Sequence, residues 1–143
     1  VALVGISNHD NVGSIFRNAA AFEADAVLLD RTCCDPLYRK AIRVSVGAAL
    51  KVPFAFADSA LALSQALERH GFCQVALSPK GEYDITKLPP AEKNALLLGS
   101  EGDGLPPELM QRLQTVRIPM SSSFDSLNVA AASAIALHRM WRG

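Results

Sequence analysis

The chain has 143 residues, half of them hydrophobic, and its 14 basic side chains are balanced by 14 acidic ones. This length predicts a single domain, residues 1–143, with enough apolar side chains to bury a proper core. A net charge of zero argues against the large basic surface that many nucleic-acid-binding proteins carry, and leaves room for a local basic patch. No apolar run approaches the length of a membrane span and no signal peptide is visible, so we expect a cytoplasmic protein without membrane contact.

The first third of the chain alternates between apolar strand patterns and helical patterns. Residues 1–6 predict a buried parallel strand, and the turn residues that follow lead into a helix capped by Asp10 or Asn11. The apolar residues of this helix recur at helical spacing and are predicted to face the core: Ile15, Ala19 and Phe22. The opposite side is predicted to carry Ser14, Arg17, Asn18 and Ala21. A second strand is expected at residues 26–30, and a second helix starts at Asp35-Pro36, where aspartate is the cap.

The same alternation continues to the C-terminus. The remaining strands are predicted at residues 52–56, 73–77, 94–98 and 116–118. The remaining helices are predicted from Asp58 or Ser59 to Gly71, from Pro106 to about Arg112, and from about Leu127 to Trp141. Residues 78–90 are expected to form an irregular connection. Strands that alternate with helices predict an α/β fold, with a mostly parallel sheet and helices on both faces.

Two predicted strands in the last third run directly into small, polar loops. The sequence GSEGDG follows residues 94–98, and PMSSSFDS follows residues 116–118. Loops at the carboxyl ends of strands in an α/β sheet are where ligands bind. The two loops therefore predict one pocket built largely from backbone. The first strand lacks the GxGxxG pattern, so an ordinary dinucleotide-binding fold is not supported.

The three cysteines are Cys33, Cys34 and Cys73. They form no Cys-x-x-Cys pair and have no histidine nearby, so we expect reduced thiols and no metal site. His138, on the predicted last helix, is interpreted as a packing or interface residue rather than a metal ligand.

Four short patterns resemble one known family. They are Asn11-Val12-Gly13 with Arg17 and Ala19, then Gly99-Ser100-Glu101 with Gly104-Leu105, then Ile118-Pro119-Met120, and Ser126-Leu127-Asn128-Val129. The first pattern resembles motif one of the SpoU (TrmH-type) RNA 2′-O-ribose methyltransferases of the SPOUT superfamily. The other three, in this order, resemble motifs two and three of the same family. The resemblance covers residues 1–142, almost the whole chain.

The resemblance implies a fold, a cofactor and a set of site residues. The fold would be the SPOUT arrangement, in which the C-terminal part passes through a loop to form a deep trefoil knot. The cofactor would be S-adenosyl-L-methionine, contacted by Gly99, Ile118 and Leu127 with Leu98, Met120 and Ser126 nearby. The catalytic residues would be Arg17, Glu101, Ser126 and Asn128. The substrate would contact Asn11, Arg17, Arg39 and Arg43.

The roles of these residues follow from their chemistry. A guanidinium is a poor base, so we interpret Arg17 as a group that binds the target phosphate and stabilises developing alkoxide charge. Glu101 either orients Arg17 or a helix start, or is a loop carboxylate bound to backbone amides. Ser126 is predicted to cap the last helix, with Asn128 in its first turn beside the pocket. Tyr38, Arg39 and Arg43 either contact phosphates and bases, or are charges and rings on a solvated helix face.

The predicted function is S-adenosylmethionine-dependent 2′-O-methylation of a ribose in a structured RNA, tRNA or rRNA. One alternative is a SPOUT methyltransferase that acts on a base, and another is a non-catalytic RNA-binding protein. The resemblance also implies a homodimer formed through the first and last helices. Small residues around Ala19 and Ala20, and from Ala130 to Ala134, are consistent with such an interface, and Arg17 would then serve the pocket of the partner chain.

Overall fold

The computed structural model describes residues 1–143 and contains one seven-stranded sheet. The strands are β1 (Ala2–Val4), β2 (Val27–Asp30), β3 (Phe54–Ala57), β4 (Cys73–Leu77), β5 (Tyr83–Asp84), β6 (Asn94–Gly99) and β7 (Gln114–Arg117). Their order is β3-β2-β1-β6-β4-β7-β5, and every neighbouring pair is parallel. The predicted α/β architecture is confirmed, and the sheet is parallel throughout.

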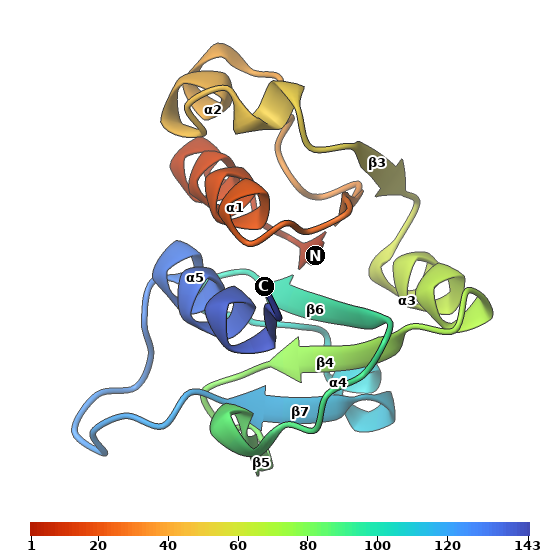
Figure 1. Ribbon diagram of the computed structural model, residues 1–143, viewed down its shortest axis with the longest axis vertical. Coiled ribbons are helices and arrows are strands. Elements are labelled where there is room, and N and C mark those ends of the chain that lie inside the picture. The colour runs from red at the N-terminus through yellow and green to blue at the C-terminus, as the bar shows by residue number, and fades with distance from the viewer.

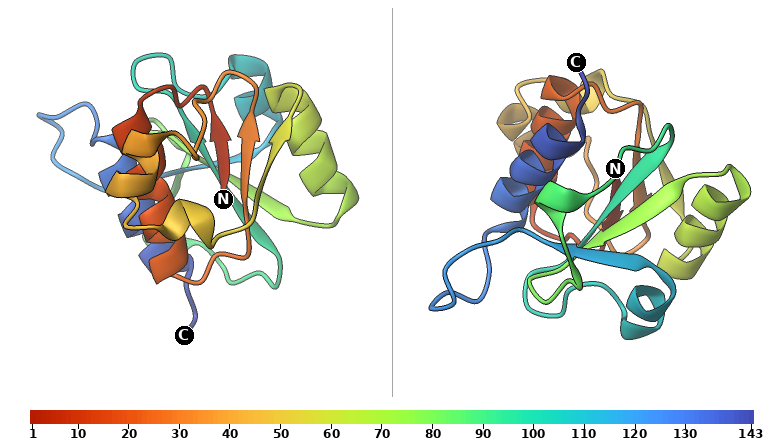
Figure 2. Two further views of the ribbon diagram at one scale, coloured as in Figure 1. Left: turned by 90° about the horizontal axis from the view of Figure 1, so that it is seen from above. Right: turned by 60° about the horizontal axis from the view of Figure 1, so that its bottom comes forward.

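Helices cover both faces of this sheet, as predicted (Figures 1 and 2). They are α1 (His9–Ala21), α2 (Arg39–Val44), α3 (Ala60–Arg69), α4 (Pro107–Arg112) and α5 (Val129–Met140), with 3-10 turns η1 (Ala48–Leu50) and η2 (Ile85–Lys87). The left view of Figure 2 shows α1, α2 and α5 on one side of the strands and α3 and α4 on the other. None of these helices combines the length and apolarity needed to cross a bilayer.

The central strand β6 connects the two halves of the core. Its side chains alternate between the faces of the sheet, as a strand period of two requires. Leu96 and Leu98 pack in a cluster with residues of α1 and α5, whereas Ala95 and Leu97 pack in a second cluster with residues of α3 and α4. All four are buried, so β6 is fixed from both sides up to the loop that follows it.

The first and last helices pack against each other within one chain. The Asn18 amide donates to the Ala130 carbonyl at 2.9 Å and to the Ser133 hydroxyl at 3.0 Å. Ala19 and Ser133 are completely buried. The expectation that Asn18 lies on the outward side of α1 is therefore wrong, because the amide side chain is used to join two helices. The small residues of α1 and α5 permit this internal contact, so they are not by themselves a sign of a dimer interface.

Several helix starts differ from the prediction because a neighbouring side chain forms the cap. Asn8, rather than Asp10 or Asn11, caps α1 by accepting the Asn11 N–H at 3.1 Å. Asp35 accepts the Leu37 N–H at 2.8 Å in a turn, and α2 starts only at Arg39. Ser59 caps α3 as predicted.

The segment expected to be an irregular connection contains β5 and η2. A Cβ atom on Gly81 would lie 2.2 Å from the Val116 carbonyl carbon, so only glycine allows this segment to approach β7. Arg117 then holds it by donating to the carbonyls of Gly81 and Glu82 at 2.9 and 2.8 Å. A strand of two residues has too short a pattern to be predicted from the sequence.

The three thiols are unpaired and differ in their exposure to solvent. Burial raises the pKa of the Cys33 thiol to about 12, whereas Cys73 is exposed. Since the thiolate is the reactive form, we expect iodoacetamide at pH 8 to label Cys73 and to leave Cys33 unmodified in the folded protein. Peptide mass mapping measures this, with protein unfolded in guanidinium as the control in which both react. Equal labelling of the two thiols in folded protein would contradict the burial of Cys33.

Candidate active site

Three segments that are distant in sequence meet at the carboxyl edge of the sheet, at the side chain of Asn128. The Asn128 amide nitrogen donates to Glu101 Oε1 at 2.9 Å and to Asn11 Oδ1 at 3.1 Å. Asn11 lies in the first turn of α1, Glu101 in the loop after β6, and Asn128 immediately before α5. The structure thus brings together one residue from each of the three motifs predicted from the sequence.

Asn128 also starts the last helix. Its side-chain oxygen accepts the N–H groups of Ala130 and Ala131 at 2.9 and 3.2 Å, which makes it the N-cap of α5. The prediction that Ser126 is the cap is therefore wrong, and α5 begins two residues later than expected. Because both ends of the Asn128 amide are bonded, its orientation is fixed by the helix on one side and by Glu101 and Asn11 on the other.

Substitutions at Asn128 separate these two roles. Asn128→Ala removes the cap and is expected to lower the free energy of unfolding by about 1 kcal/mol. Asn128→Ser keeps a cap oxygen and should stay within a few tenths of a kcal/mol of wild type, although it loses the donor to Glu101 and Asn11. Urea denaturation measures both. Ser126→Ala is the matched control, since the Ser126 hydroxyl makes no hydrogen bond in the structure. If Ser126→Ala lowered the free energy of unfolding as much as Asn128→Ala does, Ser126 rather than Asn128 would be the N-cap of α5.

Glu101 supports the same helix start. Besides Asn128, its Oε1 accepts the Val129 N–H at 3.5 Å, which places a carboxylate at the positive end of α5. The structure contains no hydrogen bond or ion pair between Glu101 and Arg17. Of the two groups that Glu101 was predicted to orient, Arg17 or a helix start, it therefore contacts the helix start. Glu101 remains exposed, and its second oxygen has no partner in the protein.

Gly99 ends β6 at a point where two backbones touch. It pairs with Val4 in the sheet, and a Cβ atom on it would lie 2.3 Å from the Gly104 carbonyl carbon and from the Leu105 nitrogen. The loop closes on itself there through a bridge between Ser100 and Gly104, whose N–H donates to the Ser100 carbonyl at 2.9 Å. Glycine is therefore required for the shape of the loop that carries Glu101.

The predicted cofactor contacts fall into a buried and an exposed group. Leu98 is buried and Ile118 is half-buried against the same core cluster. Met120, Ser126 and Leu127 are exposed, and they belong to the segment between β7 and α5 that projects from the body of the protein in both views of Figure 2. The predicted cofactor contacts therefore combine side chains of the core with side chains exposed to solvent.

The predicted substrate-binding arginines are exposed and free of protein partners. Arg17 on α1, and Arg39 and Arg43 on α2, make no hydrogen bond or ion pair through their side chains. Arg17 is not bonded to the cluster of Asn11, Glu101 and Asn128. The structure therefore brings only part of the predicted catalytic set together within one chain.

One residue that the sequence analysis missed holds the loop after β1. The buried Asp30 carboxylate accepts the Gly5 N–H at 3.0 Å and the Thr32 hydroxyl at 2.9 Å. Gly5 has a φ of +70°, and the position of its Cβ would be 3.5 Å from the Ser100 side chain. Asp30 thus fixes the loop that leads to Asn11 beside the loop that leads to Glu101. The sequence signal that could have identified Asp30 is a carboxylate at the end of an apolar strand.

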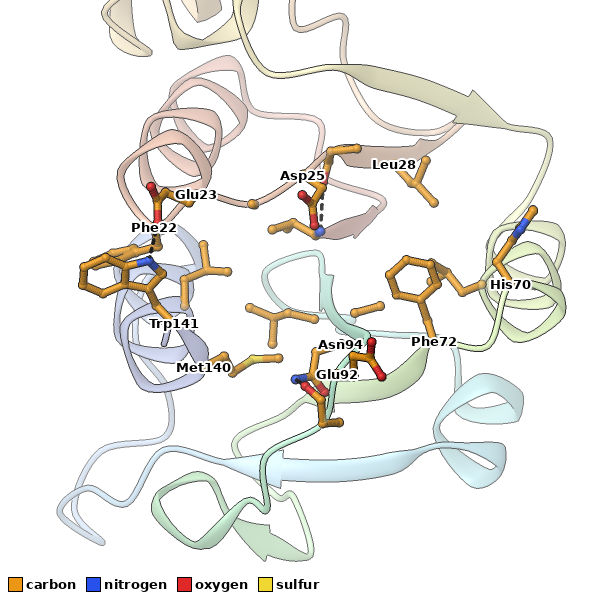
Figure 3. Close-up of a pocket in the computed structure, with 18 of the residues that line it drawn as sticks. Phe22, Glu23, Asp25, Leu28, His70, Phe72, Glu92, Asn94, Met140 and Trp141 are labelled. Atoms are coloured by element: carbon orange, nitrogen blue, oxygen red, sulfur yellow. Dashed lines mark hydrogen bonds between the residues drawn. The ribbon is translucent and has the colours of Figure 1, made fainter. Parts of the chain in front are cut away.

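A separate cavity lies at the opposite, amino edge of the sheet. Its volume is about 530 Å³, and Figure 3 shows Phe22, Glu23, Met140 and Trp141 on one side of it and His70 and Phe72 on the other. Trp141 Nε1 donates to Glu23 at 2.9 Å at its rim. None of the predicted site residues lines it. His138 packs edge-on against Phe22, which confirms the expected packing role. The structure contains no group of three or more His, Cys, Asp or Glu side chains that could hold a metal ion.

Comparison with known proteins identifies the family of this chain. The model of the SpoU rRNA methylase family matches residues 1–138. The chain belongs to the SpoU rRNA methylase family. The resemblance drawn from the sequence motifs is thereby confirmed, and S-adenosylmethionine is the cofactor of SpoU methyltransferases.

Relatives in this family include a protein described as an uncharacterized tRNA/rRNA methyltransferase of Mycobacterium tuberculosis. It is 46% identical over 98% of this chain and 50% of its own length. The 23S rRNA (guanosine-2′-O-)-methyltransferase RlmB of Vibrio cholerae is 30% identical over 96% of this chain and 56% of its own. The chain thus spans about half the length of the curated relatives it matches.

Solved structures show the same SpoU fold. An AdoMet-bound rRNA methyltransferase from Sinorhizobium meliloti superposes with a TM-score of 0.91 and 30% identity, over 97% of this chain and 54% of that one. A structure solved in work on the 2-OH methylation of C/U34 on tRNA has a TM-score of 0.89 and 31% identity, over 99% of this chain and 92% of that one.

Proposed function

We propose that this chain transfers the methyl group of S-adenosylmethionine to a ribose 2′-hydroxyl of tRNA or rRNA. The observation that carries the proposal is the contact of Asn128 with both Glu101 and Asn11, because three motif residues converge at one exposed point. The named activities of the Vibrio cholerae relative and of the tRNA-directed neighbour support the ribose hydroxyl as the acceptor.

The cofactor would be held by the loops after β6 and β7. Gly99 would offer backbone without a side chain, and we assign the further cofactor contacts to Leu98, Ile118, Met120, Ser126 and Leu127. The Sinorhizobium meliloti structure, which contains AdoMet, supports this assignment. S-adenosylmethionine supplies the electrophilic methyl group when bound, and the protein supplies position and charge.

Methyl transfer requires that the ribose oxygen be aligned with the methyl carbon and lose its proton. In the proposed site the exposed Ser126 hydroxyl orients the ribose by a hydrogen bond, and Asn128 positions Glu101 by donating to its Oε1. The second oxygen of Glu101, which has no partner in the protein, would accept the hydroxyl proton. Arg17 binds the adjacent phosphate and stabilises the developing alkoxide, while Asn11, Arg39 and Arg43 contact the RNA strand.

We propose a homodimer because Arg17 is exposed and separate from the Glu101–Asn128 cluster, so a second chain could bring its own Arg17 to the site. We further propose that the C-terminal third forms the deep trefoil knot implied by the SPOUT resemblance, and that the protein acts on RNA in the cytoplasm.

The proposed dimer can be tested directly by measuring the mass of the protein in solution. Multi-angle light scattering at micromolar concentration is expected to give twice the mass of 15.3 kDa. Because α1 and α5 already pack together inside one chain, a dimer formed through these two helices would use their outward residues. A single species of monomer mass across the concentration range would count decisively against a shared site.

The reaction itself is tested with tritiated S-adenosylmethionine and total tRNA or rRNA from cells. We expect label in RNA that survives alkali as a dinucleotide, because a methylated 2′-oxygen cannot attack the neighbouring phosphate. Label that alkali releases entirely as mononucleotides would point to base methylation, and no label in any RNA would contradict the proposal.

A further inference from the structure

Two aromatic rings stand side by side next to the candidate site and take no part in it. His9, the first residue of α1, lies with its ring centroid 4.4 Å from that of Tyr38, at an interplanar angle of 35°. Tyr38 is 56% exposed and immediately precedes α2. Its hydroxyl has no hydrogen-bond partner in the protein. One part of the Tyr38 side chain therefore contacts His9 and the rest is open to solvent.

Packing of α1 against α2 does not need this pair. The two helices are in close contact one turn further on, where a Cβ on Gly13 would lie 2.7 Å from the Ala41 carbonyl oxygen. An ion pair of Lys40 with Asp10 at 3.3 Å joins the same two elements beside the rings. These contacts fix the orientation of the helices, and the exposed face of Tyr38 adds nothing to them.

The charges around the pair suit a polyanion. Lys40 is neutralised by Asp10, and Asp35 is engaged with the Leu37 N–H. Arg39 and Arg43 on α2 remain without an acidic partner. Asp35 keeps its negative charge, so the three basic side chains Arg39, Lys40 and Arg43 stand against two acidic ones, Asp10 and Asp35, and the balance beside the rings is positive.

The pair is also close to the carboxyl-edge cluster. His9 precedes Asn11 by two residues, which is ~3 Å along the helix axis and about 200° around it. Asn11 faces Asn128, whereas His9 faces Tyr38. The first turn of α1 thus carries the candidate ribose site on one flank and the aromatic pair on the other.

We propose that His9 and Tyr38 form a stacking platform for a nucleobase of the RNA strand, adjacent to the nucleotide that is methylated. Single-stranded RNA is commonly held by aromatic side chains on which unstacked bases lie, with arginines on the phosphates. The inference rests on the proposed function, since it takes RNA as the substrate. It adds the contact that selects unpaired RNA and sets the position of the strand.

The test compares two fluorescein-labelled probes of 12 nucleotides at one salt concentration, an oligoadenylate and an abasic ribose-phosphate chain. We expect wild-type protein to bind the oligoadenylate about tenfold more tightly than the abasic chain, on the scale of one stacked base. Tyr38→Ala should abolish this preference and leave the abasic affinity unchanged. Tyr38→Phe should retain it, because the ring remains. Leu37→Ala is the matched control, since Leu37 is an exposed neighbour without a ring.

Three results would overturn the platform. The first is a Tyr38→Ala protein that keeps the wild-type preference for oligoadenylate, and the second is a Tyr38→Ala protein that loses equal affinity for both probes. The third is a Tyr38→Ala protein whose sedimentation shows a different oligomeric state from wild type, because Tyr38 would then belong to a protein–protein contact. Methyl transfer to bulk tRNA is measured on the same samples, so the two proposals fail separately. Base-dependent binding without transfer would refute the proposed function alone, and transfer with an unchanged KM in Tyr38→Ala would refute the platform alone.

Discussion

Replacing Arg17 with alanine is expected to leave the affinity for S-adenosylmethionine nearly unchanged and to lower RNA methylation by a factor of about a hundred or more. Arg17 is exposed on α1 and makes no hydrogen bond or ion pair with the loops that would hold the cofactor. A residue that acts mainly on the transition state changes turnover without altering ground-state binding. Isothermal titration with the cofactor and single-turnover methylation measure the two quantities.

Arg69→Ala provides a matched control for the lost charge. Arg69 is an exposed arginine of α3 without a hydrogen bond or ion pair, and it lies on the opposite face of the sheet. We expect wild-type methylation from this variant. An Arg17→Ala protein with full activity would remove Arg17 from the mechanism.

Mixing variants tests whether two chains share a site. If Arg17 serves the partner's site, Arg17→Ala mixed with Asn128→Ala should recover part of the activity, since each heterodimer contains one intact composite site. Absence of any rescue, with heterodimers shown by mass spectrometry, would mean that each chain completes its own site.

The second large effect is expected at Gly99. Gly99→Ala places a Cβ within 2.3 Å of backbone atoms of Gly104 and Leu105, which cannot move aside as a side chain can. The loop of residues 100–104 must therefore shift, and we expect cofactor affinity to fall tenfold or more with a stability loss of about 1–3 kcal/mol. Gly99→Val should be worse in both respects.

Gly102→Ala separates this clash from ordinary backbone strain. Gly102 lies in the same loop at a φ of +88° with nothing within 4 Å of an added Cβ. It should lose about 1–2 kcal/mol of stability and retain most of the cofactor affinity. Titration calorimetry below the melting temperature of each variant measures the cofactor affinity, and urea denaturation measures the stability. Wild-type affinity in folded Gly99→Ala would place the pocket elsewhere.

The fold was predicted correctly from the sequence where a hydrophobic pattern is compatible with only one type of secondary structure. Residues 73–77 and 94–98 were correctly assigned as strands because an apolar run bounded by turns has few other uses in an α/β chain. The pattern failed where one backbone approaches another, as at Gly81 against Val116, because such proximity leaves no periodic signal.

The candidate site was predicted through motif resemblance, and its geometry was not. Composition suggested Ser126 as the cap of α5, and only the structure shows that Asn128 both caps the helix and contacts Glu101. Both residues are good caps, so local preference could not choose between them. Asp30 was missed because its role depends on a loop 25 residues away in the sequence.

The most direct test of the central claim is mass analysis of nucleosides from RNA incubated with this protein and S-adenosylmethionine carrying a deuterated methyl group. We predict one nucleoside whose added mass lies on the ribose, so that cleavage of the glycosidic bond leaves the base unlabelled, and we predict its loss with Arg17→Ala. A deuterated base, or RNA without deuterium when a folded protein has bound the cofactor, would contradict 2′-O-methylation.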